Sequence, residues 1–149
     1  MKVYVVDASV VARLLLIEDL SDRAGLLLES FRNETVELKA PNLVTYEVGN
    51  TLWKAVTQKL IDINEALEKF SYFLKLKIGS VELDEQEYGE ALAWGVSNDA
   101  TYYDSVYVEA SRKIGATLLT ADDTLCEKAS KEVPTLHLRD LQSLSGVRS

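Results

Sequence analysis

Cysteine and long apolar runs are scarce in this sequence. The chain of 149 residues has one cysteine, Cys126, which cannot form a disulfide within the chain and excludes a zinc site built from several thiolates. The N-terminal stretch "MKVYVVDASV" reaches an aspartate after a short apolar run, so it is too short and too polar for a signal peptide or a membrane span. We therefore expect a cytoplasmic protein with no membrane partner.

Basic residues are also fewer than acidic residues. The chain has 16 Lys and Arg against 24 Asp and Glu, which gives a net charge of −8 at pH 7. This is the wrong sign for holding a nucleic acid by bulk electrostatics. A phosphate-bearing substrate would need bound cations or a local basic strip, for which the sequence offers Lys54, Lys59, Arg112 and Lys113.

The length and composition fit one globular domain spanning residues 1–149. Hydrophobic residues make up 47% and charged residues 27% of the chain, as in ordinary proteins with a buried core. No internal repeat or linker rich in proline, glycine or serine divides it. The final stretch "SLSGVRS" is expected to be a frayed tail.

Strand-like and helix-like segments alternate along the chain. We expect strands at 2–6, 36–40, 80–83, 116–120 and 134–138, with helices at 9–17, 22–32, 43–59, 64–77, 85–95, 101–115 and 123–132. Asn42 and Asn64 are placed to cap two of these helices. Alternation of this kind predicts an α/β fold, in which a parallel sheet is covered by helices on both faces.

Acidic residues follow two of the expected strands. Asp7 comes after the first strand, and Asp122 and Asp123 come after the fourth. In a sheet of order 3-2-1-4-5, strands one and four are neighbours at the switch point, where ligands bind at the carboxyl ends. Two further acids are candidates for the same crevice, Glu47 beside the apolar stripe of its helix and Asp104 in the first turn of a helix rich in tyrosine.

Each of these acids also has a structural interpretation. Asp7, Asp122 and Asp123 stand where a helix N-cap is wanted, and Thr101 with Asp104 fits a capping box. A cap contributes about 1 kcal/mol, whereas two carboxylates about 4 Å apart repel by roughly 4 kcal/mol at an effective dielectric of about 20. If the acids converge, a positive charge must therefore be present.

Oxygen ligands without histidine or thiolate suit Mg²⁺ or Mn²⁺. Such ions activate water and stabilise the leaving oxygen of a displacement at phosphorus, so metal-dependent cleavage of a phosphodiester is the chemistry that this pattern favours. The single histidine, His137, lies in the expected fifth strand and is interpreted as structural.

Four stretches in order resemble the motifs of the PIN-domain family, and most closely its compact VapC-type toxins: "VVDASV" at 5–10, "YEVGNTL" at 46–52, "YDSVYVEAS" at 103–111 and "LLTADDTL" at 118–125. The resemblance implies a three-layer α/β/α fold with a parallel five-stranded sheet of order 3-2-1-4-5. It places the metal-binding acids at Asp7, Glu47, Asp104 and Asp122.

The same resemblance implies supporting roles for Ser9, Asn50 and Thr120, while Asp123 is expected to serve the following helix N-terminus or a water beyond the metal ligands. It further implies an endoribonuclease that cleaves RNA, uses Mg²⁺ or Mn²⁺, is restrained by a VapB-like antitoxin and forms a homodimer.

Two other functions remain open at this point. One is a phosphatase or phosphotransfer protein with a nucleophilic aspartate after strand one, although "DAS" stands where a D-x-D pair would be wanted. The other is a non-catalytic PIN-like module that binds proteins and uses the acids only as caps.

Overall fold

A parallel five-stranded sheet forms the centre of the molecule in the computed structural model, which describes residues 1–16 and 18–142. The strand order is β3-β2-β1-β4-β5 and every pairing is parallel, as predicted. The strands are β1 (Lys2–Val6), β2 (Val36–Ala40), β3 (Gly79–Ser80), β4 (Thr117–Thr120) and β5 (Thr135–His137).

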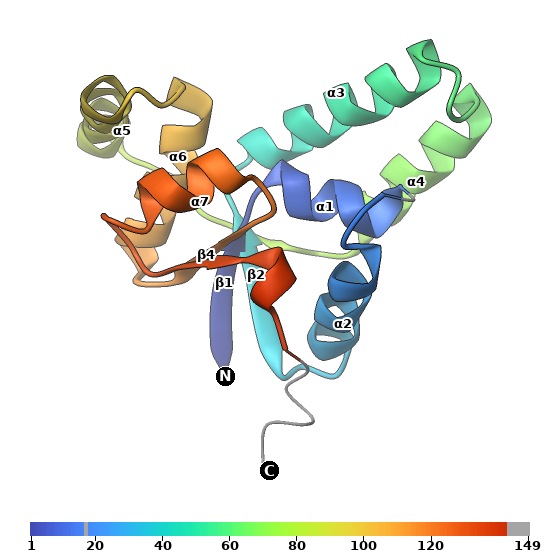
Figure 1. Cartoon of the computed structure of the whole chain (residues 1–149), viewed down its shortest axis with the longest axis horizontal. Helices are drawn as coiled ribbons and strands as arrows, with labels where there is room; N and C mark the ends of the chain where they lie inside the picture. Colours follow the sequence, from blue (N-terminus) through green and yellow to red (C-terminus); the bar gives the residue numbers. More distant parts are fainter. Residues whose placement is uncertain (17, 143–149) are drawn as a thin grey trace.

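Helices cover both faces of the sheet (Figure 1). The helices α1 and α2 lie on one side and α6 and α7 on the other, while α3 and α4 form a hairpin beyond the carboxyl ends of the strands. The helix bounds are α1 (Ala8–Leu15), α2 (Ser21–Arg32), α3 (Leu43–Thr57), α4 (Ile63–Lys75), α5 (Glu85–Asn98), α6 (Tyr102–Ile114) and α7 (Asp123–Ala129), followed by the short 3-10 turn η1 (Leu138–Asp140). This is the predicted three-layer α/β/α fold.

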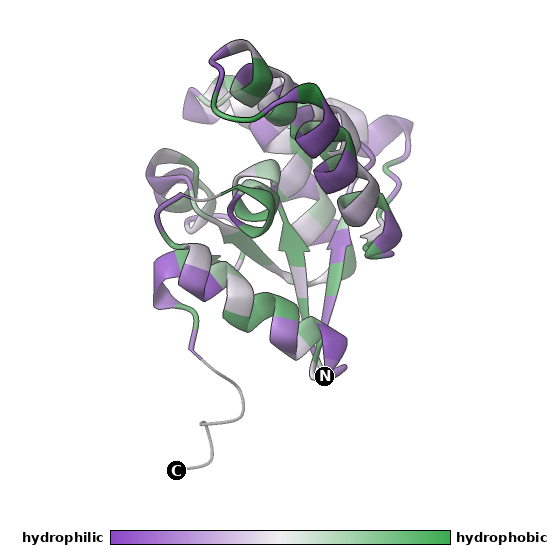
Figure 2. Ribbon diagram, turned by 90° about the vertical axis from the view of Figure 1, so that its right-hand side faces the viewer, coloured by the Kyte–Doolittle hydropathy of each residue, from purple (hydrophilic) through white to green (hydrophobic). Residues whose placement is uncertain are grey.

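The core lies along the two central strands. Val5, Val6, Leu118 and Leu119 are almost completely buried, because helices pack on both faces of β1 and β4. Figure 2 shows the same distribution, with hydrophobic residues on the strands and hydrophilic residues toward the outer surfaces of the helices. Neighbouring parallel strands end at one edge of such a sheet, so the residues that follow β1 and β4 are brought together there.

The third strand is shorter than predicted. A strand was expected at 80–83, but the observed strand is Gly79–Ser80. Val81 and Leu83, the apolar residues of the expected strand, are buried all the same. The backbone N–H of Val81 still donates to the carbonyl of Ala40 at 3.0 Å. Val81 and Leu83 therefore alternate with polar residues because they pack against the core, beyond the end of the hydrogen-bonded strand.

Two predicted caps are wrong. Asn42 has helical backbone angles, and its side chain makes no capping hydrogen bond to α3. The helix α4 begins before Asn64 and is capped by Asp62, whose carboxylate accepts from the N–H of Glu65 at 2.8 Å. An aspartate one residue before the helix was a better acceptor than an asparagine inside its first turn.

The expected helix at 9–17 is α1, which ends at Leu15. Its expected last residue, Ile17, and the expected tail at 143–149 lie outside the described residues. No helix in 1–16 or 18–142 is both long and apolar enough to span a bilayer.

Candidate active site

Asp7 is fixed at the junction between β1 and α1. It is 5% exposed, and its Oδ1 atom accepts hydrogen bonds from the N–H of Ser9 at 3.1 Å, the N–H of Val10 at 3.3 Å and the hydroxyl of Ser9 at 2.6 Å. Its Oδ2 atom accepts from the hydroxyl of Thr120 on β4 at 2.5 Å. Burial raises the pKa of Asp7 to about 6, and the hydrogen bonds from Ser9 and Thr120 oppose this rise.

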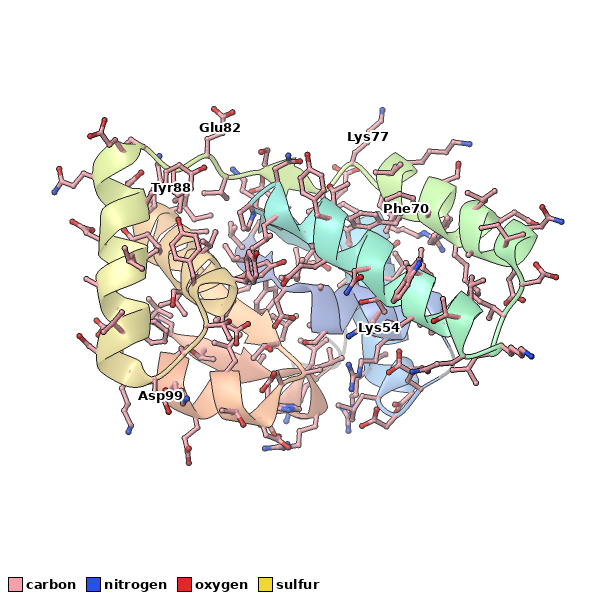
Figure 3. All side chains as sticks on the ribbon, turned by 90° about the horizontal axis from the view of Figure 1, so that it is seen from above. Lys54, Phe70, Lys77, Glu82, Tyr88 and Asp99 are labelled. Atoms are coloured by element: carbon pink, nitrogen blue, oxygen red, sulfur yellow. The ribbon has the colours of Figure 1, made fainter. Side chains whose placement is uncertain are left out.

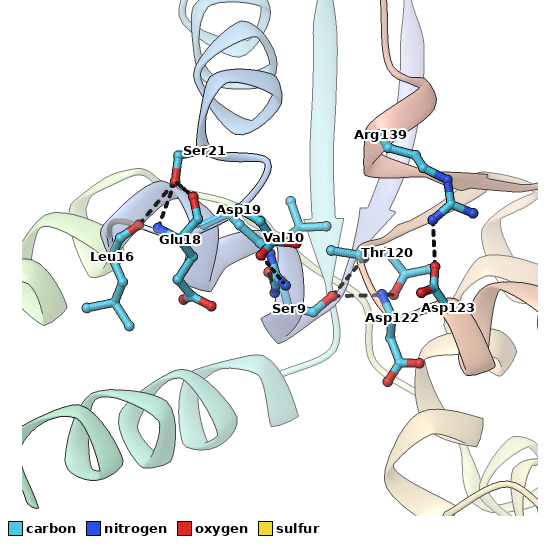
Figure 4. A network of polar contacts seen from close by, with 12 residues as sticks. Ser9, Val10, Leu16, Glu18, Asp19, Ser21, Thr120, Asp122, Asp123 and Arg139 are labelled. Carbon is cyan, nitrogen blue, oxygen red and sulfur yellow. Dashed lines mark hydrogen bonds and ion pairs between the residues drawn. The ribbon is translucent and has the colours of Figure 1, made fainter. Parts of the chain in front are cut away.

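A polar network joins the ends of β1 and β4 (Figure 4). The hydroxyl of Ser9 accepts from the N–H of Ala121 at 2.8 Å, and the hydroxyl of Thr120 accepts from the N–H of Asp122 at 3.1 Å. Asp122 in turn caps α7, because its Oδ1 atom accepts from the N–H of Leu125 at 3.0 Å. One carboxylate oxygen of Asp122 therefore remains available for a ligand.

Glu47 reaches the same region from α3. The hydroxyl of Tyr107 on α6 donates to its Oε1 atom at 2.7 Å, so a buried tyrosine orients the carboxylate. Burial, followed by this hydrogen bond to Glu47, raises the pKa of Tyr107 well above its usual value. Tyr107 therefore stays protonated and acts as a donor at any ordinary pH.

Asp104 stands in the first turn of α6, which is capped by Thr101. Burial raises the pKa of Asp104, and the negative charges of Asp122 and Glu47 raise it further. Glu47 on α3 and Asp122 at the end of β4 therefore lie close enough to disfavour the charge on Asp104.

A cavity of about 650 Å³ lies at the carboxyl edge of the sheet. Six of the eight residues proposed from the sequence line it: Asp7, Ser9, Glu47, Asn50, Asp104 and Asp122. We call it the acidic cavity. Thr120 lies behind Asp7 as its hydrogen-bond donor.

Asp123 lies elsewhere. It is the first residue of α7, but Asp122 is the cap, and the carboxylate of Asp123 is 2.6 Å from Arg139 Nη1 and 3.0 Å from His137 Nε2. The hydrogen bond from Arg139 is the main cause that lowers the pKa of Asp123. His137 is buried, and its Nδ1 atom accepts from the N–H of Arg139 at 3.1 Å, which fits a structural role.

Several lining residues were missed as site residues. They are Arg13, Glu18, Thr51 and Tyr107, each at the wall of the acidic cavity. Helical spacing carried a signal for two of them, since Arg13 lies four residues after Ser9 and Thr51 four after Glu47. Glu18 follows the end of α1, where no periodic pattern could place it.

The predicted basic strip does not form. Lys54 (labelled in Figure 3) lines the acidic cavity, and its ammonium group makes no hydrogen bond or ion pair within 1–16 and 18–142. Arg112 and Lys113 are at the far end of α6 from Asp104, where Arg112 pairs with Glu109 and Glu132, and Lys113 pairs with Glu87. The helical rise of about 1.5 Å per residue separates them from the cavity by more than one turn.

The four acids of the acidic cavity are of the chemical type that binds a hard divalent cation. All four acids offer carboxylate oxygens, which Mg²⁺ and Mn²⁺ prefer. As the side chains stand in the described part of the chain, however, no three acidic, histidine or cysteine side chains converge closely enough to hold an ion. Asp7 is fixed by its hydrogen bonds, so an ion would require the side chains of Glu47, Asp104 or Asp122 to turn toward it.

Comparisons with known proteins agree with this architecture. The chain is 38% identical over 129 residues to Ribonuclease VapC3 of Pyrobaculum aerophilum, a match that covers 83% of this chain and 92% of that protein. The fold resembles the crystal structure of PAE2754 from Pyrobaculum aerophilum, with a TM-score of 0.68, 22% identity and coverage of 93% of this chain and 90% of that one.

It also resembles the crystal structure of FitAcB from Neisseria gonorrhoeae, with a TM-score of 0.65, 15% identity and coverage of 93% of this chain and 99% of that one. At these identities the two structures support the fold alone. A profile of the PIN domain matches residues 4–131, which include all four acids of the acidic cavity. The chain belongs to the PIN domain family.

Proposed function

We propose that this protein is a metal-dependent endoribonuclease of the VapC type, which hydrolyses RNA phosphodiester bonds in the acidic cavity. The observation that carries the proposal is the gathering of Asp7, Glu47, Asp104 and Asp122 from four separate segments around one cavity. The 38% identity to a protein named as a ribonuclease supports the choice of substrate.

The four carboxylates would serve as ligands. A bound Mg²⁺ or Mn²⁺ would neutralise their repulsion and supply an activated water for attack at phosphorus. Asp7 provides a fixed anchor, because both its oxygens are held by hydrogen bonds. Tyr107 holds Glu47 toward the cavity, and Lys54 offers its free ammonium group to a substrate phosphate.

Asp104 and Asp122 are held by fewer hydrogen bonds than Asp7. Asp122 uses one oxygen as the cap of α7, and Asp104 is hydrogen-bonded to Thr101 within the first turn of its own helix. Both can therefore turn toward an ion without breaking the fold. Their repulsion is relieved when a cation is bound, which favours that change.

We further propose a VapB-like antitoxin as partner, a homodimer as the assembled state and the cytoplasm as location, as the family resemblance implies. The hairpin of α3 and α4 exposes large apolar side chains of the kind that protein partners cover: Trp53, Leu60, Ile63, Leu67 and Leu74. A purified chain is expected to bind such a partner through this hairpin.

Cleavage of a panel of structured RNAs tests the proposal. Wild type and Asp104→Asn are each incubated with EDTA, Mg²⁺ or Mn²⁺. We expect cutting only with metal, and a loss of at least about 100-fold in Asp104→Asn, because several kcal/mol of charge stabilisation depend on the metal site. Asp123→Asn is the matched control: its carboxylate faces Arg139 outside the cavity, so its cleavage should equal that of wild type.

The alternatives make different predictions. A nucleophilic aspartate needs an accessible carboxylate, whereas Asp7 is 5% exposed with both oxygens bonded. Detection of a phospho-aspartate by mass spectrometry after incubation with a phosphate donor would nevertheless favour a phosphotransfer protein. A non-catalytic module would show no rise in melting temperature with Mn²⁺, because a ligand bound only by the native state must stabilise it.

A further inference from the structure

A second cavity adjoins the acidic cavity and differs from it in chemistry. It has a volume of about 790 Å³ and is walled by Tyr46 from α3, Tyr88 from α5, and Tyr102 and Tyr103 from α6. We call it the tyrosine groove. The two cavities share Leu43, Tyr46 and Tyr103 in their walls, so the groove is continuous with the candidate catalytic centre.

The tyrosine rings stand at the surface, where those of Tyr102 and Tyr103 lie near each other with centroids 6.4 Å apart. Tyr46 is 71% exposed, Tyr103 58%, Tyr88 49% and Tyr102 39%, whereas the neighbouring Tyr107 is 1% exposed. None of the four hydroxyl groups makes a hydrogen bond with the described residues. Exposed rings of this kind offer a large apolar face at a low cost in conformational entropy.

The groove carries almost no charge. Glu82 is the one ionisable acid or base in its wall other than the tyrosines, and its side chain points outward from the rim, while Tyr88 faces the body of the molecule (Figure 3). The nearby ammonium group of Lys113 is occupied by Glu87 at 3.0 Å and by the carbonyl of Glu82. An uncharged, aromatic wall suits a planar neutral group and does not suit a phosphate.

We propose that the tyrosine groove binds an unpaired nucleobase of the RNA, by stacking on Tyr46 and Tyr103, while the adjoining phosphate enters the acidic cavity. Aromatic side chains bind bases in this way, and only bases that are not paired can be splayed out to reach them. This inference rests on the proposed ribonuclease function, and it adds a base-binding site formed by Tyr46 and Tyr103 next to the acidic cavity.

The arrangement also answers how an acidic protein holds RNA. The chain has a net charge of −8, and the acidic cavity itself repels phosphate until a cation is bound. Stacking is independent of the charge of the protein. Base contacts in the groove therefore supply binding affinity that the net negative charge of this chain cannot supply.

Equilibrium binding of a labelled single-stranded oligoribonucleotide of about six nucleotides tests the proposal. Binding by fluorescence anisotropy is compared with that of an oligomer of the same length in which abasic sites replace the bases. The variants are Tyr46→Leu, Tyr103→Leu, Tyr46→Phe and Tyr103→Phe. Tyr72→Leu is the matched control, since Tyr72 is a partly exposed aromatic residue on α4 that lines neither cavity and is not among the side chains of the proposed partner surface.

We expect each leucine variant to bind the base-containing RNA about ten-fold more weakly and the abasic oligomer as wild type does. The phenylalanine variants should stay within about two-fold of wild type, because the ring is kept. In cleavage assays the leucine variants should raise KM with little change in kcat. The control should match wild type throughout.

Other outcomes overturn the inference in distinguishable ways. If leucine variants cut and bind RNA as wild type does while cleavage still depends on metal, the groove has no role for bases and the proposed function stands. If they change only the oligomeric state by light scattering, the groove is a contact between copies of the chain. If wild type neither binds nor cuts RNA, both the function and the inference fail.

Discussion

Asp7 joins two structural roles in one side chain and lines the acidic cavity. It caps α1, and it ties β1 to β4 through the hydroxyl of Thr120. Burial moves its pKa from 3.8 to about 6, so the ionised form is disfavoured in the folded state. A shift of this size corresponds to about 3 kcal/mol of folding free energy. The cation that we propose would offset this cost, because a nearby positive charge stabilises the ionised carboxylate.

The substitution Asp7→Asn should therefore stabilise the metal-free protein at neutral pH. Because the folded pKa is raised, wild type is free of the penalty below 3.8 and loses stability as the pH rises through about 6. The variant should gain up to about 3 kcal/mol over wild type across that window, reduced by the weakened hydrogen bond to Thr120. Urea unfolding in EDTA at several pH values measures this, and a difference that does not change with pH would contradict it.

Tyr107→Phe tests the contact that orients Glu47. The hydroxyl donates at 2.7 Å to the carboxylate, and its removal leaves Glu47 without a hydrogen-bond donor among the described residues. We expect a loss of about 1–2 kcal/mol in the free energy of unfolding. A double-mutant cycle with Glu47→Ala, which removes the acceptor, isolates the contact, and strictly additive effects would rule it out.

Helix starts and strand ends supply three of the four acids that the sequence predicted and that line the acidic cavity. Asp7 caps α1, Asp122 caps α7, and Asp104 lies in the first turn of α6 with its N–H bonded to Thr101 at 3.1 Å. The capping interpretation was therefore correct for the first two. At Asp122 it does not compete with the site interpretation, because a carboxylate has two oxygens and the cap uses only one.

Substitution of alanine for glycine should change the free energy of unfolding in opposite directions at two helix positions. A Cβ atom at Gly49 in α3 would lie 3.6 Å from Phe70 Cζ, an ordinary contact, whereas one at Gly95 in α5 would lie 2.5 Å from Ser105 Oγ and 3.0 Å from the carbonyl of Ala100. Gly49→Ala should raise the free energy of unfolding by up to about 1 kcal/mol, because alanine is the better helix former.

Gly95→Ala should instead lower it by about 1–3 kcal/mol, since the side chain of Ser105 and the turn after α5 must shift. Chemical denaturation of both variants measures the two effects. Equal effects of the two substitutions would show that the packing of α5 on α6 is not as close as described.

Charge over the whole molecule sets how RNA binding should depend on salt. The net charge is −8, and Lys54 is the one cation at the acidic cavity whose side chain is unpaired among the described residues, so few counterions are released on binding. The slope of log K against log[salt] should be about −1 in the presence of EDTA, since each phosphate neutralised contributes about −0.7 for a single strand. Anisotropy titrations over a range of KCl concentrations measure it, and a slope steeper than about −3 would require a basic surface that the described residues do not offer.

The sequence by itself predicted the alternation of strands and helices and the acids that follow two of the strands, because periodicity and residue type are local features. The sheet order came from the resemblance of four ordered motifs to the PIN-domain family, and the structure confirms it. The sequence could not determine that Asp123 turns to Arg139 and away from the acidic cavity, since adjacent residues at a helix start point in different directions.

Only the tertiary structure brought Tyr107 to Glu47 and joined the tyrosine groove to the acidic cavity. In the folded chain the predicted basic strip does not form, because Arg112 and Lys113 pair with acidic side chains at the end of α6 that lies away from the cavity. These are contacts between residues far apart in the chain, and their geometry depends on how helices pack over the sheet, which no local pattern encodes.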